Sequence, residues 1–185
     1  MSSHPNKLRP TISVYIATSI DGYIAKKEDG LDWLETFSPP LDNPHEDYGH
    51  KKFMSTIDAL VMGRGTYKIA SSVEIWPYPG KRVIVLSSTL TSVCKEAELF
   101  SGNIIPLVEK LYKEGVKHIY VDGGVTISQF MNARMIDHIT LSIIPVILGS
   151  GIPIFSNILH ESWCQLISSK AYSNGLVQLQ YTLTG

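Results

Sequence analysis

Short runs of β-branched and aliphatic residues alternate along this chain with segments in which apolar residues recur at helical spacing. The runs that predict strands are followed by serine, glycine or aspartate, and they lie at Thr11–Thr18, Ala59–Met62, Val83–Leu86 and His118–Val121. Parallel strands need a crossover connection, which is usually a helix. The alternation therefore predicts a largely parallel sheet with helices packed on it.

The C-terminal part of the chain has a different pattern. A β-rich run at His138–Ile147 contains Pro145, and two further extended runs, Cys164–Ser168 and Leu176–Leu183, flank a turn at Ser173–Gly175. Strands joined by a short turn pair antiparallel, so the tail is expected to add antiparallel strands to one edge. The predicted fold class is α/β, with three layers (α/β/α) around a mixed, mostly parallel sheet.

Four segments are predicted to be helical. The clearest begins at Ile104, where apolar residues recur at helical spacing, with Asn103 as the N-cap and Gly115 just beyond the C-terminus of the helix. The first is expected to start at Asn43 and Pro44, because proline is favoured in the first turn of a helix. The predicted helices are His45–Thr56, Thr66–Val73, Ile104–Tyr112 and Val125–Met131.

The composition is typical of one globular domain. The chain has 185 residues, of which 44% are hydrophobic, and its net charge of -1 argues against binding nucleic acid through bulk electrostatics. No apolar run approaches the roughly 20 residues of a membrane span. Residues 1–10 lack the apolar core of a secretory signal and are expected to be flexible, ahead of a single domain at 11–185. With 2 cysteines there is no disulfide scaffold, and we expect a cytoplasmic protein.

Three predicted strands end in small or polar residues that suit phosphate binding. These ends are Gly63-Arg64-Gly65-Thr66, Ser87-Ser88 and Asp122-Gly123-Gly124. Ligands of open α/β sheets collect at the carboxyl ends of the strands, and free N–H groups at helix N-termini bind phosphate. The guanidinium of Arg64 also matches phosphate. Tight turns alone would explain any one of these ends, whereas the occurrence of all three favours a common anion site.

Other known site patterns are missing from the sequence. The glycines form neither a complete dinucleotide fingerprint nor a phosphate-binding P-loop. His45 and His50 do not have the spacing of a zinc-binding helix, so no metal site is expected. Trp33 lies in a predicted loop, where it can either pack on the core or contact a ligand. Asp47 falls in the first turn of a predicted helix, where it can either stabilise the helix dipole or act in catalysis.

Six motifs, in this order and spacing, resemble those of the dihydrofolate reductase fold. They are S-I-D-G-Y-I-A (Ser19–Ala25), D-W-L (Asp32–Leu34), V-M-G-R-G-T-Y (Val61–Tyr67), K-R-V-I-V-L-S-S (Lys81–Ser88), V-D-G-G (Val121–Gly124) and I-I-P-V-I-L-G-S-G-I-P-I-F (Ile143–Phe155). Within that fold, the chain most resembles the reductase domain of bifunctional riboflavin-biosynthesis proteins. Their deaminase half, with its zinc-binding signature, has no counterpart here, so the resemblance implies a stand-alone reductase with a dihydrofolate reductase-like fold.

The resemblance implies NADPH as the cofactor. The matching positions are Gly63, Arg64, Gly65 and Thr66 for the cofactor phosphates; Leu86, Ser87 and Ser88 for the adenosine 2′-phosphate; Gly123, Gly124, Val125 and Thr126 for the pyrophosphate and nicotinamide; and Ala17 and Ile24 beside the nicotinamide ring. Asp47 matches the acid that binds and helps to protonate the substrate ring, and burial would raise its pKa. Trp33 matches a position near the loop that closes over that ring.

The implied activity is hydride transfer from NADPH to a C=N bond of a small pyrimidine- or pteridine-type heterocycle. The nearest match is a 5-amino-6-(5-phosphoribosylamino)uracil reductase of the riboflavin type. The alternatives are a dihydrofolate or other pteridine reductase, a module that binds NADPH without catalysis, and a protein that keeps only the fold. Because the riboflavin-type branch is commonly dimeric and the C-terminal strands are apolar, a homodimer is expected.

Overall fold

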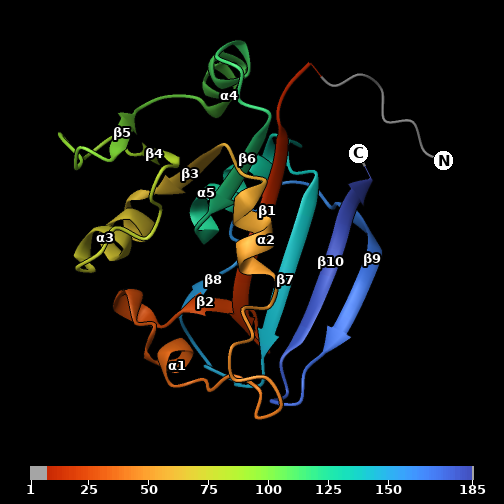
Figure 1. Cartoon of the computed structure of the whole chain (residues 1–185). Coiled ribbons are helices and arrows are strands. Elements are labelled where there is room, and N and C mark those ends of the chain that lie inside the picture. The colour runs from red at the N-terminus through yellow and green to blue at the C-terminus, as the bar shows by residue number, and fades with distance from the viewer. Residues whose placement is uncertain (1–7, 185) are drawn as a thin grey trace.

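A mixed sheet of eight strands forms the centre of the protein (Figure 1). The computed structural model describes residues 8–184, and the strand order within them is β5-β4-β3-β6-β1-β7-β10-β9. These strands are β1 (Thr11–Ser19), β3 (Ala59–Gly63), β4 (Arg82–Leu86), β5 (Ala97–Phe100), β6 (His118–Asp122), β7 (His138–Ile144), β9 (Trp163–Ala171) and β10 (Val177–Thr184). Neighbours from β5 to β7 are parallel, while β10 and β9 are antiparallel, which confirms the predicted mixed sheet.

Helices cover both faces of the sheet, as the three-layer prediction requires. Alternate residues of β3 point to opposite faces, so that Ala59 and Val61 pack in one core cluster and Leu60 and Met62 in the other. Helices α4 (Ile104–Lys113) and α5 (Gly124–Asn132) complete the first cluster. Helices α2 (His50–Ser55) and α3 (Arg64–Ser72) contribute side chains to the second. Figure 1 shows α2 in front of the sheet and α5 behind it.

The predicted helix ends agree with the structure for α4. The side chain of Asn103 accepts a hydrogen bond from the N–H group of Ile105 at 2.9 Å and so caps the helix. Gly115 follows the last turn with a φ of 91°, which suits glycine at this position. Helices α3 and α5 begin one or two residues earlier than predicted, within the normal uncertainty of helix ends.

Two predicted boundaries are wrong. Helix α2 begins at His50 instead of His45, because Tyr48 and Gly49 adopt left-handed φ angles of 56° and 87°. Strand β7 ends at Ile144 instead of Ile147, because the next residue, Pro145, has no N–H group to donate to a neighbouring strand.

Several short elements were not predicted. They are the 3₁₀ turn η1 (Lys27–Asp29), helix α1 (Asp32–Glu35), strand β5 at one edge of the large sheet, and strand β8 (Ile152–Pro153), which pairs with β2 (Tyr23–Ala25). Each is too short for hydrophobic periodicity to reveal it. The pairing of β2 with β8 matters for the site, because it brings the segment after β7 back beside β1.

The expected flexible segment 1–10 is only partly described. Residues 1–7 lie outside the described part of the chain. Arg9 and Pro10 contradict the expectation of flexibility, since Arg9 donates to both oxygens of Asp137, at 2.8 and 3.0 Å, and Pro10 is buried. No helix within residues 8–184 is long and apolar enough to cross a membrane. The cytoplasmic location stays a prediction.

Candidate cofactor and substrate site

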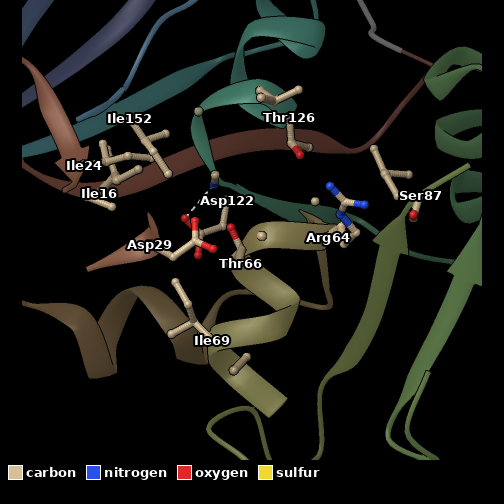
Figure 2. A pocket seen from close by; sticks show the side chains of 18 of the residues that line it. Ile16, Ile24, Asp29, Arg64, Thr66, Ile69, Ser87, Asp122, Thr126 and Ile152 are labelled. Carbon is tan, nitrogen blue, oxygen red and sulfur yellow. Dashed lines mark hydrogen bonds between the residues drawn. The ribbon is translucent and has the colours of Figure 1, made fainter. Parts of the chain in front are cut away.

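A pocket of about 930 Å³ lies at the carboxyl ends of the central strands (Figure 2). The structure brings to it every residue that the resemblance assigned to the cofactor. These are Ala17, Ile24, Gly63, Arg64, Gly65, Thr66, Leu86, Ser87, Ser88, Gly123, Gly124, Val125 and Thr126. Parallel pairing of β1, β3, β4 and β6 explains this convergence, because it places the carboxyl ends of all four strands on one edge. Contact of these residues with a cofactor stays a prediction.

Two helices begin at this pocket with uncapped N-termini. Gly63 precedes α3 and Gly123 precedes α5, and within residues 8–184 no side chain accepts from the first N–H groups of either helix. Such groups carry partial positive charge and bind phosphate. Gly123 has a φ of 90°, and a Cβ atom there would lie 2.5 Å from Oγ1 of Thr66. Only glycine leaves this approach to the N-terminus of α5 open.

Two threonine hydroxyls lie beside the helix starts. Figure 2 shows Thr66 and Thr126 on the first turns of α3 and α5. A Cβ on Gly63 would come within 2.9 Å of Oγ1 of Thr126, so the backbone of β3 passes close to this hydroxyl. Neither hydroxyl has a hydrogen-bond partner among the described residues, and both are therefore free to bind an anion in the pocket.

Arg64 and a group of hydroxyls form one end of the pocket. Nη1 of Arg64 donates to Oγ1 of Thr89 at 3.1 Å. Oγ of Ser87 accepts from the N–H groups of Thr89 and Leu90, at 3.2 and 3.0 Å, and so fixes the turn after β4. This arrangement presents a guanidinium and hydroxyl groups to a phosphate. Thr89 was not predicted, although its position two residues after Ser87 suits a side chain held by a serine turn.

Apolar side chains form another part of the pocket. Figure 2 shows Ile16, Ile24 and Ile152 gathered together, away from Arg64. Strand β8 contributes Ile152 because the carboxylate of Asp21 accepts from the N–H groups of Leu148, at 3.1 Å, and Gly149, at 2.7 Å. These bonds hold the turn before β8 against the turn between β1 and β2. The site thus offers an apolar surface in addition to its anion-binding groups. Ile152 was not among the site residues predicted from the sequence.

Asp122 is the most perturbed carboxyl group that lines the pocket. Burial raises its pKa to about 6, although the N–H group of Gly123 donates to Oδ1 at 2.8 Å and opposes that rise. Burial, together with the negative charge of Asp122, also raises the pKa of Tyr78. From the sequence, Asp122 was interpreted only as part of a glycine turn. Its place at the carboxyl end of a buried strand, directly before two glycines, is the feature that could have marked it as a site residue.

Asp47 does not line this pocket. Its carboxylate accepts from the N–H groups of Lys51 and Gly49, both at 3.0 Å, and these bonds lower its pKa. The expectation of a raised pKa is therefore wrong. Asp47 precedes α2 instead of lying in it and caps its N-terminus, which was the alternative to catalysis. It lines a second cavity of about 590 Å³, which shares Tyr15 with the large pocket.

Trp33 belongs to the core and not to the lining of the large pocket. It is buried in α1 and clusters with Ile144 and Leu176. Its neighbours Leu31 and Leu34 line the pocket in its place. The sequence left core packing and ligand contact open for Trp33, and its position in the structure agrees with core packing. The expectation of substrate contact is not supported.

The known proteins that this chain resembles point to one family. The model of the RibD C-terminal domain family matches residues 10–178. YwjB, an uncharacterized protein of Bacillus subtilis (strain 168), is 33% identical over 171 residues, which are 91% of this chain and 95% of YwjB. The solved structure of a candidate riboflavin biosynthesis protein from Shewanella sp. PV-4 is 35% identical, with a TM-score of 0.87 over 95% of this chain and 99% of that chain.

A more distant structure shares the fold. Dihydrofolate reductase from Enterococcus faecalis, complexed with NADP(H) and RAB-propyl, is 17% identical, with a TM-score of 0.63 over 95% of this chain and 97% of that chain. The fold of the present chain is therefore dihydrofolate reductase-like, as its motifs predicted.

Proposed function

This chain belongs to the RibD C-terminal domain family, and from that membership we propose that it is a reductase that uses NADPH to reduce a C=N bond of a pyrimidine- or pteridine-type heterocycle. The observation that carries the proposal is the make-up of one pocket. Uncapped helix N-termini and Arg64 line it together with an apolar surface and the carboxyl group of Asp122. These are the groups that an anionic dinucleotide and a proton-accepting substrate require.

The anion-binding groups fit NADPH better than NADH. The N-termini of α3 and α5 suit the two phosphates of the pyrophosphate bridge. Arg64, Ser87 and Thr89 lie together and suit a further phosphate, which NADPH carries on its adenosine ribose and NADH lacks. NADP(H) in the dihydrofolate reductase from Enterococcus faecalis supports the same choice.

When bound, NADPH supplies the hydride, and the protein orients the reactants. Ile16, Ile24 and Ile152 form an apolar surface that suits one face of a nicotinamide ring and excludes water from it. Holding two reactants at near-attack distance can contribute up to about 7–11 kcal/mol of the barrier reduction. The role of this surface is therefore to fix the ring relative to the substrate.

Asp122 is the residue that we assign to proton transfer. The reduction of C=N needs one proton on nitrogen, and a carboxyl group whose pKa is about 6 is partly protonated near neutral pH. Asp122 lines the same pocket as the apolar surface, whereas Asp47 lies in the second cavity with a lowered pKa. The proposed proton donor is accordingly Asp122 and not Asp47.

The direct test is the oxidation of NADPH in the presence of candidate acceptors. Purified protein is incubated with NADPH and, in turn, a dihydropterin, dihydrofolate or a ribosylaminopyrimidine, and NADPH loss and reduced product are measured. We expect oxidation that depends on one of these acceptors. Tight binding of NADPH without any oxidation would contradict the reductase and favour a non-catalytic module that binds NADPH. No binding of NADPH would favour a protein that keeps only the reductase fold.

A homodimer is the assembly that we propose. All nine residues of β9 are exposed, including Trp163 (75%), Leu166 (50%) and Ile167 (58%). Figure 1 shows β9 at the outer edge of the sheet, where its outer backbone groups have no neighbouring strand among the described residues. An exposed apolar edge strand is a site of association, and a second copy supplies a self-complementary edge through a two-fold axis.

A further inference from the structure

The charges along the large pocket are unevenly distributed. Among the described residues that line it, the charged side chains are Asp29, Arg64 and Asp122. Figure 2 shows Arg64 beside Ser87, at the end where the adenosine phosphate is expected. Oδ1 of Asp29 would lie 3.7 Å from a Cβ on Gly65, which places this carboxylate close to the start of α3. The part of the pocket beyond Arg64 therefore carries two carboxyl groups.

Much of the wall of the large pocket is aromatic and aliphatic. The side chains that form this part of the lining are Tyr15, Ile69, Ala70, Val73, Pro77, Tyr78 and Tyr120. The hydroxyls of two of these tyrosines are engaged within the protein, since Tyr15 donates to the carbonyl of Tyr48 at 2.6 Å and Tyr120 donates to the carbonyl of Tyr15 at 2.9 Å. Such walls suit a flat heterocycle, and the protonated carboxyl group of Asp122 can donate a hydrogen bond to a ring nitrogen.

The nearby lysines belong to the second cavity. Lys52 and Lys170 line it together with Glu46 and Asp47, so its charges are balanced. Nζ of Lys170 lies 3.8 Å from Oε2 of Glu46 and 4.2 Å from the ring centre of Tyr172. These contacts hold the ammonium group within that cavity. Among the described residues no lysine lines the large pocket, so a phosphate ester there would share the pocket with the carboxyl groups of Asp29 and Asp122.

We propose that the acceptor is a phosphate-free heterocycle whose reacting C=N nitrogen accepts a hydrogen bond from the protonated carboxyl group of Asp122. This inference rests on the proposed function and narrows its substrate class, because it disfavours the phosphoribosylated pyrimidine. In the reaction, the C=N carbon gains the hydride and its two electrons from NADPH, which is oxidised to NADP⁺. The nitrogen gains the proton of Asp122, which solvent then restores. A dianionic phosphate in this part of the pocket would be repelled by the carboxylate of Asp29 and by the anion that proton transfer leaves on Asp122, and like charges in one site reduce binding.

A matched pair of acceptors tests the inference. We compare a 5-amino-6-ribosylaminopyrimidine with its 5′-phosphate ester, and include an unphosphorylated dihydropterin, by measuring NADPH oxidation and product formation. We expect kcat/KM for the better phosphate-free acceptor to exceed that of the ester by about tenfold or more. An ester that is reduced as well as, or better than, both phosphate-free acceptors would overturn the inference while the proposed function stands. Reduction of none of the three would overturn both.

Charge variants make the same test independent of the choice of acceptor skeleton. Val73→Lys adds a cation at the lining of the pocket and is expected to raise kcat/KM for the ester relative to its phosphate-free partner. Ile75→Lys adds the same charge two residues away, outside the lining, and is the matched control. Lys170→Gln is expected to leave the ratio unchanged. A preference for the ester that disappears in Lys170→Gln would show that phosphate reaches the second cavity, which contradicts the inference.

Discussion

The pKa of Asp122 is set by opposing contributions. Burial favours the neutral carboxyl group, whereas the N–H group of Gly123 and, less strongly, the side chain of Tyr120 favour the carboxylate, with burial the largest effect. A proton donor must be protonated to act, so kcat is expected to fall as the pH rises through about 6. Asp122→Asn keeps the shape but cannot transfer a proton, and should lower kcat by roughly 10²–10⁴-fold.

The check on Asp122 is a pH profile of kcat for both proteins, with NADPH affinity measured in parallel. The variant should bind NADPH like the wild type and should lose the pH-dependent decrease. Unchanged kcat in Asp122→Asn would remove Asp122 from the proton transfer.

Asp47 has a structural role in this account. Asp47→Ala removes the acceptor of two N–H groups at the start of α2, and should lower Tm by about 2–4 °C, the shift expected from a lost cap of about 1 kcal/mol. Its kcat should stay close to the wild-type value. Because the pKa of Asp47 is lowered in the folded protein, its stabilisation is present above the unfolded pKa and is lost as the pH falls through the folded pKa.

Thermal unfolding and turnover of Asp47→Ala measure the two roles separately. A large loss of kcat at unchanged Tm would restore Asp47 to the catalytic role that the family resemblance implied.

The sequence was informative where chemistry depends on residue type and strand position. Arg64, Ser87 and Gly123 could be placed in one site because each follows a recognisable strand. Asp47 and Trp33 could not be assigned, since each residue type suits two environments and only the tertiary contacts decide between them. Asp122 was overlooked because its pKa depends on burial, which a local motif does not reveal.

At the scale of elements, the start of α5 is the most constrained part of the site. Gly123→Ala would combine strain from a φ of 90° with a Cβ only 2.5 Å from Oγ1 of Thr66. We expect NADPH affinity to fall by about tenfold or more, because the lost N–H contacts to phosphate are charge-assisted and contribute about 1.5–3 kcal/mol each. The measurement is the Kd of NADPH by calorimetry.

Gly115→Ala is the matched control for Gly123→Ala. Gly115 has a similar φ of 91°, but a Cβ there would meet nothing within 4 Å, and the residue precedes β6 and does not line the pocket. It should lose stability through backbone strain and keep its NADPH affinity. Equal loss of affinity in both variants would contradict the assignment of Gly123 to the site.

Long elements were easier to predict than short ones. Strand β6 and helix α4 have strong patterns and matched the expectation. The β2–β8 pair was not visible, because its formation depends on Asp21 holding a turn more than one hundred residues away in the sequence. The predicted start of α2 was also wrong. Pro44 favoured an earlier start, but the left-handed backbone at Tyr48 and Gly49 prevents the helix from beginning before His50.

At the scale of the whole molecule, the sheet has one edge that we expect a second copy to cover. Leu166→Glu combined with Ile167→Glu places two charges on exposed β9, beside the irregularity in its pairing with β10, and should convert a dimer to a monomer. Sedimentation or light scattering at micromolar concentration measures the mass. A monomeric wild type would contradict the homodimer, and a dimer that survives the double substitution would place the interface elsewhere.

The overall architecture followed from the sequence because alternation of strands and helices restricts a chain to few topologies. The antiparallel edge also followed, from the turn that joins the last two strands. The exposure of β9 did not, because a run of apolar residues has the same pattern whether it is covered by the same chain or left for a partner.

The central claim is that one pocket binds a dinucleotide with an additional phosphate beside Arg64. The most direct measurement is the Kd of NADPH and of NADH for the wild type, Arg64→Ala and the control Lys68→Ala, which removes a positive charge from the same helix outside the lining. The wild type and Lys68→Ala should prefer NADPH by about tenfold or more, and Arg64→Ala should lose that preference. Equal affinity of the wild type for both nucleotides, or tighter binding of NADH, would contradict the account.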